Sequence, residues 1–315
     1  MIVPSNPETV PNQSNMTTRT KIPRHFHFVF GMRPQEEPFH LVYYLCLESC
    51  LQVNRPERIS VYYHYEPYGP WWNRIRDRID TVHVPLNELV TNMEYSNRHI
   101  GRKLRYAHHA DFVRVEKLLE HGGVYADMDT LFLRPLAKDL FNHSFVLGRE
   151  KRVTDPRTGE SWESLCNAFI MSEPGAEFAR IWLERMHDVF NGNWSDHSCK
   201  LAQILSEECP QHIHVEAPSS FYPYMWTRED LCSLFEECHE NWNGAYSVHL
   251  WNHLWWSSKK TNYSTISGKK LTERYIRKVD TTYTIAARRF LPPQKNLFKQ
   301  LHNRVSSMIA LGGNT

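Results

Sequence analysis

The stretch HHADFVRVEKLLEHGGVYADMDTLFLRPL, residues 108–136, decides how this chain folds. Its first half has the apolar spacing of an amphipathic helix, which we expect over residues 101–121. Two glycines then end the helix. The apolar residues 124–126 predict a short buried strand that leads directly to the acidic pair Asp127 and Asp129. A helix that turns tightly into a buried strand is typical of an α/β protein.

Shorter patterns on both sides extend this alternation of strands and helices. Because the two kinds of element alternate, the sequence predicts an α/β fold with a central, mostly parallel sheet and crossover helices. The expected strands cover 25–30, 59–63, 82–84, 131–133, 145–147, 168–171 and 247–250, and the expected helices cover 38–53, 71–79, 177–190 and 199–207.

Three regions are expected along the chain. Residues 1–21 are polar and lack periodicity, which predicts a disordered lead-in. Residues 22–257 form the main domain, and residues 258–315 form a basic extension that we expect to be helical.

Composition excludes several classes of protein. Hydrophobic residues make up 41% of the 315 residues and charged residues 23%, as in ordinary globular proteins. A formal net charge of +2 argues against a nucleic-acid partner. We find no run of 18 apolar residues, so we predict no transmembrane segment in this chain. The location then stays open between the cytoplasm and, if an N-terminal anchor is missing from this chain, the Golgi lumen.

The acidic pair is the first candidate site. Asp127 and Asp129 flank one residue directly after the expected strand, so alternation places both carboxylates on the same side of the chain. Ligands of open α/β sheets bind beyond the carboxyl ends of the strands. Two carboxylates there suit a hard divalent cation, Mn²⁺ or Mg²⁺, that bridges diphosphate oxygens. The alternative is a solvated acidic turn without function.

The helix before the acidic pair contains a second candidate. Asp111 falls within its apolar stripe, and Arg114, three residues on, flanks the same edge. A carboxylate that faces a core is costly unless it is paired or bound to a ligand. Two readings stay open: a buried Asp111–Arg114 pair that only fixes the helix, or a donor site in which Asp111 meets sugar hydroxyls and Arg114 meets phosphate or sugar.

The quoted stretch closely resembles the core of the DxD sugar-binding glycosyltransferases of family 32. The family pattern is S-D-x-x-R, a helix, G-G-x-Y-x-D-x-D and an apolar strand. Ala110 stands where the family usually has serine. The residues that match at the family's spacing are Asp111, Arg114, Gly122, Gly123, Tyr125, Asp127 and Asp129.

Three further stretches carry the same resemblance, which covers residues 22–257. The segment IPRHFHFVFG is similar to the opening strand that contacts the nucleotide, which implies a role for Phe28. The segment CNAFIMSEPGAEF implies that Asn167 lies near the transferred sugar. The segments FYPYMW and YSVHLWNH are similar to α1,4-galactosyltransferases and imply that His249 lies by the metal and phosphates. Trp251 either covers the diphosphate or packs in the core.

The resemblance implies a GT-A-like fold and a metal-dependent retaining transfer that forms an α-linkage. The expected donor is a nucleotide-sugar, most plausibly a UDP-hexose or UDP-N-acetylhexosamine, and the expected acceptor is a glycan or glycolipid. The alternatives are a nucleotide-sugar hydrolase and an inactive carbohydrate- or nucleotide-binding module on the same fold. The implied roles are catalysis for Asp111, Asn167 and Asp129, nucleotide-sugar binding for Phe28, Arg114, Tyr125, Asp127 and Trp251, and metal binding for Asp127, Asp129 and His249.

Overall fold

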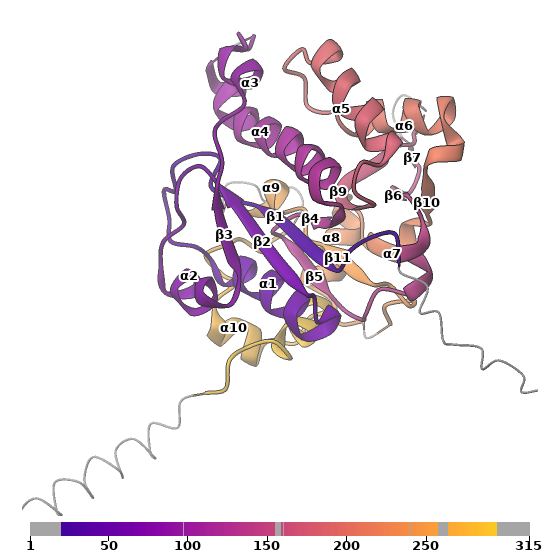
Figure 1. Cartoon of the computed structure of the whole chain (residues 1–315). Helices are drawn as coiled ribbons and strands as arrows, with labels where there is room; N and C mark the ends of the chain where they lie inside the picture. The colour runs from indigo at the N-terminus through magenta and orange to yellow at the C-terminus, as the bar shows by residue number, and fades with distance from the viewer. Residues whose placement is uncertain are drawn as a thin grey trace, which may run out of the picture.

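A seven-stranded sheet forms the centre of the molecule (Figure 1). The computed structural model describes residues 20–96, 98–154, 159, 161–239, 241–257 and 264–294. The strand order is β10-β6-β9-β4-β1-β2-β3. The strands of this sheet are β1 (His25–Val29), β2 (Arg58–Tyr63), β3 (Asp80–His83), β4 (Gly123–Ala126), β6 (Phe145–Arg149), β9 (Leu165–Ser172) and β10 (His214–Glu216).

The sheet is mostly parallel, as the sequence predicted. Strand β1 pairs in parallel with β2 and with β4, β2 with β3, and β10 with β6. Only β9 runs the other way, between β4 and β6. Two short pairs lie outside this sheet: β5 (Thr130–Phe132) with β11 (Ser247–His249), and β7 (Val153–Thr154) with β8 (Ser161–Trp162).

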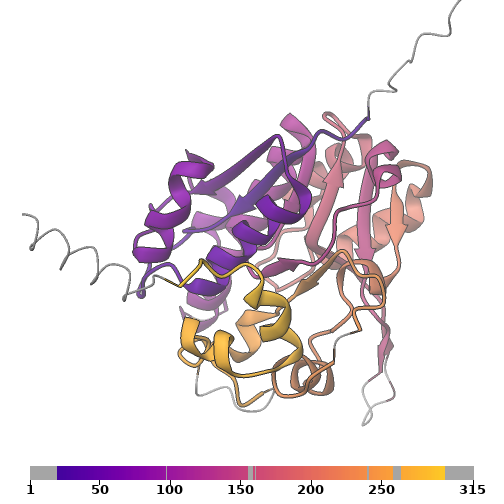
Figure 2. The same cartoon turned by 90° about the horizontal axis from the view of Figure 1, so that it is seen from below.

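Helices cover both faces of the sheet, as Figures 1 and 2 show. One core contains apolar residues of α4 (Arg98–His121), α5 (Glu177–Val189) and α6 (Cys199–Glu208). The other contains those of α1 (Leu41–Asn54) and the later helices α8 (Arg228–Phe235), α10 (Glu273–Lys278) and α11 (Thr282–Arg288). Shorter helices are α2 (Pro70–Ile75), α3 (Glu88–Asn92), α7 (Pro218–Phe221) and α9 (Asn252–Trp255), with 3₁₀ turns at Arg76–Arg78, Lys138–Asn142 and Pro210–His212.

Side chains along β1 point alternately to the two faces of the sheet, so this strand contributes apolar residues to both cores. Phe26 and Phe28 point into the core under α1, whereas Val29 belongs to the core under α4. This covering of both faces confirms the predicted α/β fold with a central, mostly parallel sheet. The structure describes two helices in the C-terminal extension, α10 and α11, whereas residues 1–19 and 295–315 lie outside the described residues.

Several expected boundaries were displaced by local hydrogen bonds. Helix α1 begins at Leu41 rather than at Pro38, because the His40 ring accepts a hydrogen bond from the Val42 amide and caps the helix. The helix expected over 71–79 ends at Ile75 and continues only as a 3₁₀ turn.

The turn between α4 and β4 requires both glycines. Gly122 and Gly123 have φ values of 63° and 112°, in the left-handed region. A Cβ atom on Gly123 would lie 2.2 Å from the carbonyl oxygen of His25, and one on Gly122 would contact Pro174. The expected helix stop is therefore confirmed, and it lets β4 pair closely with β1.

Side chains of α1 hold the strand that follows the acidic pair. The Phe132 amide donates to the Ser49 hydroxyl over 3.1 Å, and the Leu136 amide donates to Asn54 Oδ1 over 3.1 Å. Strand β5 pairs with β11 on one edge only, so these α1 side chains satisfy backbone donors on the other edge. Helix α1 thus fixes where the acidic pair leaves the sheet.

In the described part of the chain, no helix has both the length and the apolar character needed to span a bilayer.

Replacing Ser49 by alanine should lower the free energy of unfolding by about 1 to 3 kcal/mol, because it leaves the buried Phe132 amide without an acceptor. Chemical denaturation measures the effect. Gln52→Ala, at an exposed position of the same helix, is the matched control. Equal stability of Ser49→Ala and Gln52→Ala would show that Ser49 does not anchor β5.

Candidate metal and nucleotide-sugar site

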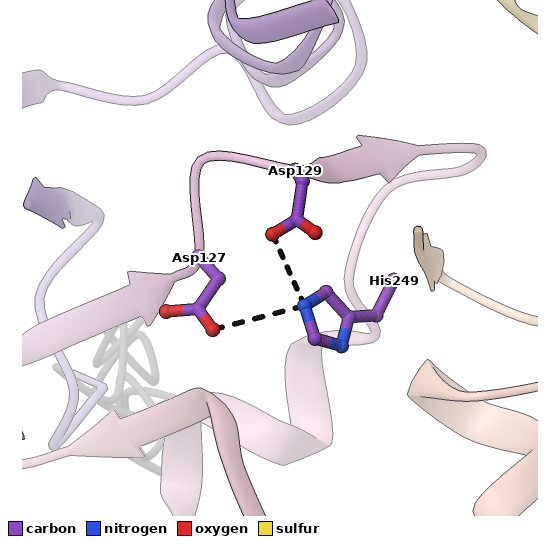
Figure 3. Close-up of side chains that lie close together, drawn as sticks. All are labelled: Asp127, Asp129 and His249. Atoms are coloured by element: carbon purple, nitrogen blue, oxygen red, sulfur yellow. Dashed lines mark hydrogen bonds and ion pairs between the residues drawn. The ribbon is translucent and has the colours of Figure 1, made fainter. Parts of the chain in front are cut away.

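Asp127, Asp129 and His249 meet at the carboxyl end of β4 (Figure 3). The Asp127 amide still donates to Ala168 of β9 over 2.9 Å, and the chain then turns into β5. Strand β11 pairs antiparallel with β5 and places His249 opposite Thr130. One ligand atom from each of the three side chains lies within 4.8 Å of the others. Backbone pairing alone thus brings together residues 120 positions apart.

One oxygen of each carboxylate is held by a neighbour, and the other faces His249. Asp127 Oδ1 accepts from the Tyr125 hydroxyl over 2.5 Å. Asp129 Oδ2 accepts from the Asn252 amide over 2.9 Å. The remaining oxygens lie 3.7 Å (Asp127 Oδ2) and 3.1 Å (Asp129 Oδ1) from His249 Nε2. Partners that orient ligands in this way are typical of metal sites.

Trp251 shapes the loop that supplies the Asn252 amide. Its φ of 54° places this bulky residue in the left-handed region, where side chains other than glycine rarely lie. It is the N-cap of α9, so the strained turn aims the Asn252 amide at Asp129. The indole is almost fully buried, donates to the Tyr224 carbonyl over 3.0 Å and lies 4.2 Å from the His249 ring. Trp251 therefore lies beside the site and within the core.

The donor set fits a divalent cation. Burial raises the pKa of the Asp127 carboxyl, and the Asp129 carboxylate beside it acts in the same direction, against the charges of Arg114 and His249. Two carboxylates this close repel each other, and a bound cation would remove that cost. The Asp127 side chain is 26% exposed while Asp129 and His249 are below a tenth, so the site opens toward solvent on the Asp127 side. Two carboxylates and an imidazole are side chains that can hold a divalent cation.

Arg114 connects the metal cluster, our name for the side chains of Asp127, Asp129 and His249, to a second polar group that contains Asp111 and Asn167. Its guanidinium lies 3.4 Å from Asp127 Oδ1 and 3.1 Å from Asp111 Oδ1, and it donates to the Asn167 carbonyl over 2.7 Å. Its carbon also lies 4.6 Å from the centre of the Tyr125 ring. The side chain is only 6% exposed. Arg114 is therefore a buried cation shared by two carboxylates.

Asp111 and Asn167 form a pair next to Arg114. Asn167 Nδ2 donates to Asp111 Oδ1 over 2.8 Å, and the imidazole of His197 bonds to Asp111 Oδ2 over 3.0 Å. Burial opposes the charge on Asp111, but the Arg114 charge and the His197 hydrogen bond hold its pKa below the ordinary value. Both oxygens of Asp111 are thus occupied within the protein.

The predicted residues do not all come together. Seven of them form one connected network, and Trp251 adjoins it; the seven are Asp111, Arg114, Tyr125, Asp127, Asp129, Asn167 and His249. Phe28 does not join them: it is fully buried in the core under α1, with its ring 6.4 Å from that of Phe132.

Sequence reasoning missed His197, Tyr106 and Arg33. Asp127 and Asp129 both raise the pKa of Tyr106, in addition to its burial, and the Arg33 guanidinium lies 4.2 Å from the Tyr106 ring. His197 lies 86 residues from Asp111, its partner. No spacing rule links such residues. Only the place of Arg33, just after the first strand at the carboxyl edge, offered a signal.

Comparison with known proteins agrees with this geometry. Residues 49–147 match the family described as the glycosyltransferase sugar-binding region containing a DXD motif. Glucan organizing enzyme 1 of Cryptococcus neoformans is 28% identical over 285 residues, which cover 87% of this chain and 72% of that protein. Human lactosylceramide 4-alpha-galactosyltransferase is 24% identical over 191 residues, 55% of this chain. The matched part spans about half, 49%, of the human enzyme's length.

Solved glycosyltransferase structures are more distant. The galactosyltransferase LgtC, in complex with donor and acceptor sugar analogues, has a TM-score of 0.44 at 12% identity over 88% of this chain and 99% of its own. GlyE of Streptococcus pneumoniae has a TM-score of 0.42 at 11% identity over 85% of this chain and 63% of its own.

The matched region contains α4, the glycine turn and the acidic pair, whereas Asn167 of β9 and His249 of β11 lie beyond it. Residues 49–147 therefore match a glycosyltransferase sugar-binding region that contains a DXD motif, and the chain is a glycosyltransferase.

Proposed function

We propose that this glycosyltransferase is metal-dependent and retaining. It moves a hexose or N-acetylhexosamine from a UDP-sugar to a glycan or glycolipid acceptor and forms an α-linkage. The observation that supports this most directly is the orientation of Asp127 and Asp129, each with one oxygen held and one facing His249 Nε2. The similarity to lactosylceramide 4-alpha-galactosyltransferases supports the α-linkage.

Asp127, Asp129 and His249 would hold Mn²⁺ or Mg²⁺. A divalent cation at this place neutralises charge on the diphosphate that leaves. Tyr125, Arg114 and the Asn252 amide keep the ligands in position. Arg33, whose guanidinium lies over Tyr106 near the acidic pair, is a candidate to bind the phosphates as well.

Asn167 and Asp111 are the candidates on the sugar side. A glycosyl transition state develops positive charge at the anomeric carbon, so oxygen atoms nearby stabilise it. Asp111 is bonded on both oxygens, which makes it a positioning residue that orients Asn167 and Arg114. Phe28, fully buried behind this edge, would support the nucleotide pocket only through packing.

Two other functions are distinguished by simple observations. A nucleotide-sugar hydrolase would release nucleotide at a rate that no acceptor increases. An inactive binding module would hold nucleotide-sugar without releasing the sugar. The intact network around Arg114 favours an active enzyme over a binding module, because it costs buried charge that a binding module does not need.

The metal assignment predicts that a chelator abolishes transfer and that Mn²⁺ or Mg²⁺ restores it. Asp129→Asn should lose turnover by orders of magnitude, and calorimetry should show that it no longer binds Mn²⁺. Glu120→Gln, an exposed carboxylate on α4, is the control and should bind Mn²⁺ as the wild type does. Full activity in excess chelator would remove the metal from the proposal.

Asp111→Asn should lower the free energy of unfolding by about 3 kcal/mol, because Arg114 loses one of its two buried counter-charges. Since the pKa of Asp111 is lowered, its contribution to stability is present above the unfolded pKa of about 3.9 and is lost as the pH falls below that value. Denaturation at pH 7 and pH 3 should therefore show a smaller difference between variant and wild type at pH 3. An unchanged melting temperature combined with lost turnover would instead mean that Asp111 contacts the substrate directly.

The product should be an α-glycoside. The similarity to α-galactosyltransferases implies that the α-configuration of the UDP-sugar is preserved in the product. After a screen of UDP- and GDP-sugars with Mn²⁺ has found the donor, proton NMR of the new linkage gives its anomeric coupling. A large coupling for a galactosyl or glucosyl product would establish a β-linkage and exclude a retaining mechanism.

A further inference from the structure

Trp194 is the largest exposed apolar side chain among those whose exposure the structure describes. It lies between α5 and α6, and half of its surface, 50%, is open to solvent. The other tryptophans with a described exposure are at least partly buried in the cores or packed against them. Covering this exposed part of the indole with a ligand would remove apolar surface from water, which is favourable.

The loop that carries Trp194 is held in one conformation. Asp196 accepts hydrogen bonds from the side-chain amides of Asn191 and Asn193 over 2.9 and 2.8 Å, and it pairs with Lys200 over 2.8 Å. The Asn191 side chain also accepts from the Asn193 amide. Such a loop presents the indole with little further loss of conformational freedom on binding.

The same loop is fixed to the sugar side of the site. His197, three residues after Trp194, is fully buried and bonds to Asp111 Oδ2 over 3.0 Å. Its carbonyl accepts from the Trp182 indole of α5 over 3.2 Å. Asp111 in turn holds Asn167, so the position of Trp194 is tied to the group that we place beside the transferred sugar.

On its other side, Trp194 reaches the metal half of the site. Its ring centre lies 5.4 Å from that of His253, with the rings tilted by 39°. His253 follows Asn252, whose backbone amide donates to Asp129 Oδ2 over 2.9 Å. Trp194 is therefore open to solvent on a loop that is anchored at Asp111 through His197, and its ring contacts His253 in the segment that reaches Asp129 through Asn252.

We propose that Trp194 is the platform on which the sugar ring of the acceptor stacks. This inference rests on the proposed function. The apolar C–H face of a pyranose covers an indole well, and the indole combines a large rigid surface with one N–H donor. The acceptor is thus a saccharide whose terminal ring lies flat on Trp194, with one hydroxyl directed to the anomeric carbon of the donor.

The test compares Trp194→Ala with Trp194→Phe and with Ile204→Ala, which removes another exposed apolar side chain on α6. With the donor identified by the nucleotide-sugar screen, lactose and a short glucan oligosaccharide serve as acceptors. Trp194→Ala should raise the acceptor KM about tenfold, as expected for the loss of about 1.4 kcal/mol of stacking, while the donor KM stays the same. Trp194→Phe should recover part of the loss, and Ile204→Ala should match the wild type.

A binding measurement separates this inference from the proposed function. Saturation-transfer NMR with UDP and Mn²⁺ present should detect lactose or the glucan on the wild-type protein and lose the signal in Trp194→Ala. A signal that persists in Trp194→Ala, or no saccharide signal from the wild type, overturns the platform. If the wild type binds saccharide but releases no nucleotide from any donor, the transferase proposal fails and the saccharide platform stands.

Discussion

The buried guanidinium of Arg114 is the interaction on which the site depends. From its place on α4 it pairs with Asp111 of the same helix, with Asp127 at the end of the next element, β4, and with the Asn167 carbonyl of the more distant strand β9. A buried cation is tolerable only because two carboxylates and a carbonyl surround it. The sequence pattern of an aspartate and an arginine three residues apart on a helix thus has one physical role, which is to fix both halves of the site relative to the sheet.

The parts of the fold that follow from local periodicity were predictable. Helix α4, the glycine turn and β4 follow from apolar spacing and from glycine's tolerance of positive φ. The reversed direction of β9 was not, because a continuous apolar run does not encode strand direction. Strand β10 consists of the partly exposed residues His214–Glu216 and carries no apolar pattern at all.

The residues of the site also divide into those that the sequence could predict and those that it could not. Asp127, Asp129, Asp111 and Arg114 lie within 19 residues, so spacing and family resemblance were enough to group them. His197 and Arg33 reach the site only through tertiary structure, and neither stands in a pattern that differs from an ordinary loop. For Phe28 the sequence prediction went too far. Its strand leads toward the expected edge of the sheet, but the alternation of side chains places the Phe28 ring in the core.

The pairing of β11 with β5 explains how Asp127, Asp129 and His249 can lie close together although two of them carry like charges. Two close carboxylates destabilise the fold, and His249 and Arg114 offset this repulsion from opposite sides. The position of His249 is set by the register of β11 against β5, in which His249 lies opposite Thr130. The acidic pair therefore has this imidazole beside it only when the last third of the chain is packed against β5. The same segment brings Asn252 to Asp129 and His253 to Trp194. The docking of β11 and α9 therefore places His249 and Asn252 beside Asp129 and His253 beside Trp194.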